Sequence, residues 1–143
     1  MVEPTDIERL EQVIAHTVAP AFMFAGIAGF IALMMGRLNS IIERSRALNA
    51  IADQDAKRSH LRADIPRLVR RAQLLNRAIL LAIGSGLALT LLILLSFASA
   101  FLKLHHVPVA AVLFVLAVAL LGTALLYLAR EVRTALNQSD HHP

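Results

Sequence analysis

The chain has 143 residues, of which 57% are hydrophobic and 17% are charged, and its formal net charge is +4. A soluble domain carries about a quarter of its residues as Asp, Glu, Lys or Arg, so this composition argues against an ordinary soluble domain. Cysteine is absent, which excludes disulfide bonds, thiolate metal sites and cysteine nucleophiles.

Three stretches contain no Asp, Glu, Lys or Arg: Gln12 to Gly36, Ala78 to Leu102 and Leu104 to Ala129. A helix needs about 20 apolar residues to cross the roughly 30 Å hydrocarbon core of a bilayer, and each stretch is long enough. None of them has the polar face that a helix of a soluble bundle presents to water. We therefore predict three transmembrane helices, which we place near residues 13–36, 78–102 and 108–129.

The stretch AHTVAPAF, residues 15–22, puts an ionisable ring and a proline at the start of the first span. If the helix is unbroken from Asp6, Pro20 frees the carbonyl of His16, and that carbonyl, the imidazole and the Thr17 hydroxyl form a kink that binds an ion or gates a pore. Alternatively, a surface helix ends at His16, and Thr17 caps a second helix with Pro20 in its first turn. The edge position favours the second arrangement. The candidate pore or gate residues are His16, Thr17 and Pro20.

Small residues indicate where the spans pack, because membrane helices associate through close contact. Ala25 and Gly29 belong to such a row in the first span, and Ala82 and Gly86 belong to one in the second span. The small faces exceed what three helices need internally, so they predict a homo-oligomer. The alternative is that alanine and glycine are simply common in membrane helices.

The loop after the first span is predicted to be a helical hairpin that extends the first two spans. Apolar residues keep a helical spacing from Leu38 to Ala52, and no glycine or proline interrupts residues 37–64. Asp64 followed by Pro66 indicates a helix start, because aspartate caps helices and proline is tolerated in the first turn. The tip of the hairpin is expected near residues 53–64.

The basic residues predict the orientation. Ten of the fourteen Lys and Arg residues lie between Arg37 and Arg77, and Arg130 and Arg133 follow the third span. Lysine and arginine accumulate in cytoplasmic loops because they resist translocation. We expect the N-terminus outside and the hairpin 37–77 and the C-terminus inside.

The predicted fold class is therefore an all-α integral membrane protein with three transmembrane helices and a cytoplasmic helical hairpin. Residues 1–136 form a single membrane domain in which Pro108 opens the third span, and the tail 137–143 is expected to be disordered.

Asn39, Glu43 and Asn76 are predicted to lie at the inner boundary of the first two spans. A hydrogen bond between the two asparagines across the hairpin is expected, and an ion-coordinating ring in an oligomer is the alternative.

A basic group is predicted on the helix that enters the second span. Its expected partners are the bilayer and its anionic lipid head groups, and a basic vestibule of an oligomer is the alternative. Nucleic acid is not an expected partner, because aromatic residues are not interleaved with the basic ones. The group consists of Arg67, Arg70, Arg71 and Arg77.

No catalytic constellation is present, so we predict neither an enzyme nor a cofactor or metal site. His105 and His106 are adjacent in a loop, which is not the spacing of a helical metal site. The only ionisable side chain at bilayer depth is His16, which argues against an ion-coupled transporter.

Three stretches resemble a known bacterial family. They are APAFMFAGIAGFIALMMGRLNSIIERSRAL at 19–48, RRAQLLNRAILLA at 70–82 and LYLAREVRTAL at 126–136. Together they resemble the small bacterial three-helix membrane proteins grouped as domain of unknown function 2721, over roughly residues 8–136. The resemblance implies the bacterial inner membrane. That family has no assigned activity, so no catalytic or binding residue carries over.

Two functions fit these predictions. The favoured one is a small homo-oligomeric ion channel with its pore between protomers, and the basic hairpin then predicts a preference for anions. The alternative is a non-transporting oligomeric scaffold or accessory subunit that presents the basic hairpin to an unidentified protein partner.

Overall fold

The computed structural model describes residues 4–50, 59–102 and 107–136, and these residues form helices. Helix α1 covers Pro4–Asn49, and a short 3₁₀ helix, η1, covers Ser59–Asp64. Helix α2 covers Ile65–Leu102, and helix α3 covers Val107–Leu136. The predicted tail 137–143, the loop with His105 and His106, and residues 53–58 of the predicted hairpin tip lie outside the described residues.

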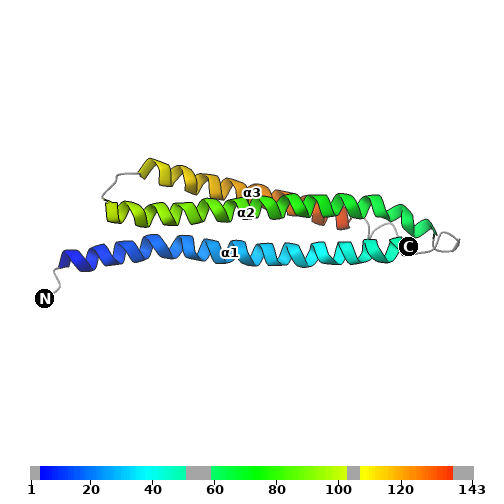
Figure 1. The fold of residues 1–143 in the computed structure, drawn as a ribbon, viewed down its shortest axis with the longest axis horizontal. Helices are drawn as coiled ribbons and strands as arrows, with labels where there is room; N and C mark the ends of the chain where they lie inside the picture. The colour runs from blue at the N-terminus through cyan, green and yellow to red at the C-terminus, as the bar shows by residue number, and fades with distance from the viewer. Residues whose placement is uncertain (1–3, 51–58, 103–106, 137–143) are drawn as a thin grey trace.

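The three long helices lie side by side, with α2 between α1 and α3 (Figure 1). The chain reverses direction between successive helices, so α1 and α3 run parallel to each other and antiparallel to α2. Helices α1 and α2 continue past the last turn of α3. We call the end of the bundle where α1 ends and α2 begins the hairpin end.

Three of the described helices are long and apolar enough to cross a membrane, as predicted. The candidate spans lie within Val18–Asn49, Arg62–Ala98 and Pro108–Leu136. At about 1.5 Å per residue, the 46 residues of α1 extend about 70 Å, more than twice the thickness of a hydrocarbon core. The first two helices therefore reach well beyond the apolar layer.

Helix α1 is continuous through Pro20, so the favoured prediction of two helices that meet at Thr17 is wrong. Proline in a membrane helix is tolerated because neighbouring groups satisfy the freed backbone carbonyl. The helix begins at Pro4, where a missing N–H has no cost. The side chains of His16 and Thr17 lie outside the described part of the structure, so the predicted cluster at a kink stays a prediction.

Two further prolines, Pro66 and Pro108, lie where the sequence predicted helix starts. Helix α2 begins directly after Asp64, and Pro66 is its second residue. Pro108 is the second residue of α3. Proline at these positions has no hydrogen bond to lose, and its fixed φ suits the first turn. Asp64 also lies 3.7 Å from the guanidinium of Arg67, one turn into α2.

The buried residues recur at intervals of seven, the period of helices that pack as coiled coils. On α1 they are Ile27, Met34 and Ile41, and on α3 they are Ala117, Ala124 and Glu131. The central helix has two such rows because it packs on both sides. These rows are Leu68, Leu75, Ala82 and Leu89, and Ala78, Ser85 and Leu92.

The four small residues predicted to pack helices together fall into two groups. Ala82 is fully buried, and a Cβ added at Gly86 would lie 3.8 Å from the side chain of Ile27, so both face a neighbouring helix. Ala25 and Gly29 on α1 are exposed. The internal packing of the protomer therefore uses the small residues of α2, and those of α1 stay uncovered.

Candidate functional site

Glu131 is a fully buried carboxylate at the hairpin end of α3. It comes two residues after the charge-free stretch of α3 ends, at Ala129. It continues the row that Ala117 and Ala124 begin, so helical spacing turns its side chain towards α2. An isolated carboxylate in such a place would be costly, so its partners define the site.

Two arginines from the other two helices hold this carboxylate. Arg71 of α2 donates two hydrogen bonds to Oε1, from Nε at 3.0 Å and from Nη2 at 2.8 Å. Arg37 of α1 donates from Nη2 to Oε2 at 2.8 Å. Each carboxylate oxygen therefore has its own guanidinium, and one acidic residue joins α1, α2 and α3. We call Arg37, Arg71 and Glu131 the Glu131 cluster.

Burial decreases from the centre of the cluster outwards. The Glu131 side chain is 0% exposed, that of Arg71 is 16% exposed and that of Arg37 is 37% exposed. Two guanidiniums around one carboxylate leave the cluster with an excess positive charge. The arrangement has no nucleophile or proton donor poised for chemistry. The cluster fixes the relative position of the three helices and leaves a positively charged surface where Arg37 and Arg71 are partly exposed.

The sequence did not predict that Arg37, Arg71 and Glu131 pair with one another, and it placed Arg71 in the basic group of the helix that enters the second span. The partners are 94 and 60 residues apart in the chain, so no local spacing links them. One signal was available: Glu131 lies at seven-residue spacing from two alanines of the packing face. A charge at such a position requires a buried partner.

The predicted asparagine clamp is not formed within the described ranges. Asn39 and Asn76 are both exposed, and no hydrogen bond joins them. The physical reason is helical spacing, because Asn39 lies on the side of α1 opposite to Ile41 and Met34, which face α2. The contact across the hairpin is made by the Glu131 cluster instead. Glu43 is exposed on the same side of α1 as Asn39.

The predicted basic group is divided by the structure. Arg71 is mostly buried in the Glu131 cluster, whereas Arg67, Arg70 and Arg77 are exposed along α2. Their exposure is compatible with lipid head groups and with solvent.

In the described part of α2 and α3, serine and threonine hydroxyls donate to backbone carbonyls of the chain itself. Ser85 is buried and donates to the carbonyl of Ala117 at 2.7 Å, which links α2 to α3. Thr90 and Thr123 each donate to the carbonyl four residues earlier, at 2.9 Å and 2.8 Å. These hydroxyls already have acceptors, so the protomer does not depend on water to satisfy them.

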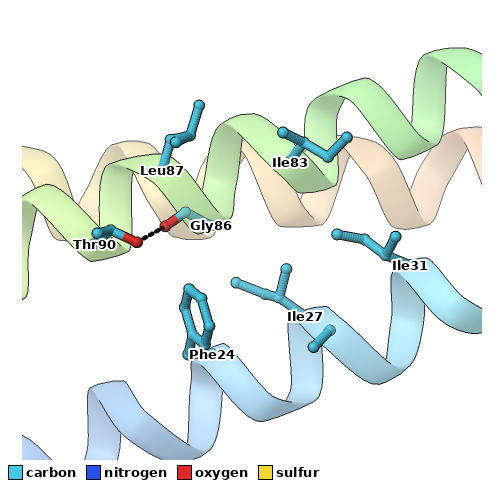
Figure 2. A pocket seen from close by; sticks show the side chains of 8 residues that line it. Phe24, Ile27, Ile31, Ile83, Gly86, Leu87 and Thr90 are labelled. Atoms are coloured by element: carbon cyan, nitrogen blue, oxygen red, sulfur yellow. Dashed lines mark hydrogen bonds between the residues drawn. The ribbon is translucent and has the colours of Figure 1, made fainter.

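An apolar groove of about 220 Å³ lies between α1 and α2 in the membrane-spanning region (Figure 2). Its one side-chain hydroxyl belongs to Thr90, and the hydrogen bond to the carbonyl of Gly86 occupies that hydroxyl's proton. The lining side chains of the groove therefore offer a ligand no hydrogen-bond donor. It is lined by Phe24, Ile27, Ala28, Ile31, Ile83, Gly86, Leu87 and Thr90.

The side of α1 that points away from α2 carries a row of small residues. They follow one another at spacings of four, three and four, which keeps them on one face of a helix. All are exposed, and a Cβ added at Gly29 or Gly36 meets nothing within 4 Å. The same face continues to Asn39 and Glu43. The row consists of Ala25, Gly29, Ala32 and Gly36, and we call it the small face of α1.

Comparison with known proteins agrees with the resemblance in the sequence. The model of the family described as "Protein of unknown function (DUF2721)" matches residues 17–141. No curated protein and no solved structure matches the chain. The match covers all three candidate spans, the Glu131 cluster and the small face of α1. The chain therefore belongs to the DUF2721 family.

Proposed function

We propose that this protein is a homo-oligomeric, non-transporting membrane scaffold that presents several copies of its α1–α2 hairpin on one side of the membrane. The observation that carries the proposal is the small face of α1. Its residues are exposed in the protomer although they have the type and spacing of a helix-packing face. Lipid tails are as apolar as leucine, so close backbone approach is what favours contact between membrane helices.

The location and orientation of the scaffold follow from its charges. We place it in a bacterial inner membrane with the hairpin end in the cytoplasm, because ten of its fourteen Lys and Arg residues lie between Arg37 and Arg77. The hairpin would then be accessible to cytoplasmic proteins, and its exposed basic residues would be available to an acidic partner.

The polar groups of the spans support a scaffold over a pore. Residues 18–36 of α1 include no polar side chain, so an axis lined by α1 would be apolar over much of the membrane. Apolar constrictions of this kind empty of water and block ions. The described serine and threonine hydroxyls of α2 and α3 are bonded to backbone carbonyls.

A pore between protomers is the second candidate, and one observation favours it. Asn39 and Glu43 continue the small face of α1, so a symmetric assembly about that face would gather them into rings. Rings of acidic side chains select cations. The anion preference was predicted from the basic hairpin 37–77 as a whole, whereas the charged residue that continues the small face of α1 is Glu43.

Ion flux into liposomes that contain the purified protein tests the two candidates. The scaffold proposal predicts no flux above that of protein-free liposomes, for potassium or for chloride. Conductance would overturn it. A cation-selective reversal potential that Glu43→Gln weakens and Glu8→Gln leaves unchanged would assign the pore to the Glu43 ring. Both glutamates are exposed on α1, so the two variants change the same charge at different ends of the helix.

A further inference from the structure

A second cavity, of about 250 Å³, lies beside the Glu131 cluster between α1 and α2. Its volume is several times the ~30 Å³ that a water molecule occupies in the liquid, so a phosphate-sized group fits with some of its water. Four of its five lining residues are polar, in contrast to the apolar groove further along the same pair of helices. It is lined by Arg37, Ser40, Ile41, Arg44 and Arg71, and we call it the arginine pocket.

The arginine pocket has more positive charge than its surroundings neutralise. Three guanidiniums line it. Among the described residues, Glu131 is the carboxylate beside them, and it already accepts hydrogen bonds on both oxygens from Arg37 and Arg71. Arg44 forms no ion pair with any residue in the described part of the chain. Arg44 therefore brings to the pocket a positive charge that no described residue pairs with, and an anion would neutralise it.

One donor in this pocket lacks an acceptor. The Nε of Arg37 is buried and makes no hydrogen bond to the described residues, although Nη2 of the same guanidinium is held by Glu131. Buried donors are nearly always paired, so an unpaired one next to a cavity indicates a missing acceptor. The Ser40 hydroxyl lines the same cavity and bonds only weakly to the carbonyl of Gly36, at 3.2 Å.

We propose that the arginine pocket binds a phosphate group, and that this phosphate belongs to the head group of an anionic membrane lipid. Guanidinium presents a planar fork of N–H donors that matches the oxygens of phosphate, and arginine is the residue that most often performs this recognition. Arg44 and the Nε of Arg37 supply donors that the Glu131 cluster leaves unused. Arg71 contributes charge while its own bonds hold Glu131.

The position of the pocket favours a lipid as the source of the phosphate. Arg37 follows directly on Gly36, the last residue of the charge-free stretch of α1, and Ser40 and Arg44 lie one and two turns further. This depth is where the polar head groups of a bilayer begin, and basic pockets between membrane helices at this depth bind anionic head groups. The exposed arginines of α2 add general attraction, but they do not enclose a site.

The experiment compares two variants that remove the same charge from the same helix. Arg44→Gln changes the pocket, and Arg46→Gln changes an exposed arginine that does not line it. The full chain is purified in a mild detergent, and its affinity is measured for phosphatidic acid and for phosphatidylcholine in mixed micelles. Loss of a charge-assisted hydrogen bond weakens binding by about tenfold or more. We expect this loss of phosphatidic acid affinity in Arg44→Gln, and no more than a twofold change in Arg46→Gln.

Inorganic phosphate distinguishes the two possible sources. Competition between millimolar phosphate and phosphatidic acid in the wild type, absent in Arg44→Gln, would support a site for the phosphate group. Phosphate binding without any preference for phosphatidic acid over phosphatidylcholine would overturn the lipid source. Equal losses in the two variants would overturn the proposal as a whole, because general surface charge would then explain the binding. Arg44 is exposed, so a folding defect is not expected, and the melting temperature of each variant checks this.

Discussion

At the scale of single residues, Glu131 is the least expected feature of the protein. It is a fully buried charge in a row that is otherwise alanine, and it makes three hydrogen bonds to two arginines. Replacing a whole buried ion cluster by apolar residues is often neutral for stability, but removal of one member leaves uncompensated charge. A polar group at one position of a coiled-coil seam also fixes the register of the helices. We assign this second role to Glu131.

Glu131→Gln tests this assignment. The substitution keeps the size of the side chain but removes the charge that Arg37 and Arg71 share, so we expect a loss of about 3 kcal/mol in the free energy of unfolding. The measurement is reversible unfolding in mixed micelles with increasing SDS. Glu8→Gln is the matched control, because Glu8 is exposed, and it should change stability by less than about 0.5 kcal/mol. Equal stability of the two variants would contradict a structural role for the cluster.

The Glu131 cluster could not be predicted from the sequence, because its members are far apart in the chain. Charge-free stretches and prolines act locally, so they predicted the spans and the starts of α2 and α3. The partners of Glu131 are set by how the helices pack, and Arg37 is 94 residues away from it. The sequence singled out Asn39 and Asn76 because both lie at the predicted inner boundary of the first two spans, yet both side chains are exposed.

At the scale of helices, the main correction concerns α1. The sequence favoured a break near Thr17 because the motif lies at the edge of the predicted span. In the structure, Pro20 lies inside a helix of 46 residues. A helix nucleated on both sides of one proline loses a single hydrogen bond, whereas a break in a membrane would leave several backbone groups unpaired. The membrane environment, rather than the proline itself, therefore determines that α1 is continuous. The continuous α1 connects one end of the bundle directly to the other.

The direction in which α1 and α2 cross the membrane is testable because the chain has no cysteine. Single cysteines at Glu8→Cys and Arg70→Cys lie at exposed positions near opposite ends of the bundle. With the hairpin end in the cytoplasm, a membrane-impermeant maleimide should label Glu8→Cys in intact cells of a bacterial host. It should label Arg70→Cys only after permeabilisation. The reverse pattern would contradict the orientation that we derive from the basic residues.

At the scale of the whole molecule, the protomer is a row of three helices with most of its apolar surface outside. Within the candidate span of α1, only 11% of the most apolar window is buried by the rest of the chain, and α3 has the same fraction. Lipid covers such surfaces without penalty, so exposure alone does not require a partner. The small face of α1 differs because its alanine and glycine residues are too small to fill the space beside the helix. Its extension beyond the membrane leads directly to the hairpin.

The central claim is that protomers assemble through the small face of α1, and the mass of the assembly tests it most directly. Gly29→Leu combined with Gly36→Leu adds bulk to that face, and neither site meets another atom within 4 Å in the protomer. Gly122→Leu on α3 is the matched control, because it is equally uncrowded. Native mass spectrometry from mild detergent should give an oligomer for the wild type and for Gly122→Leu, and a monomer for the double variant. A monomeric wild type, or an oligomer that survives both leucines, would contradict the account.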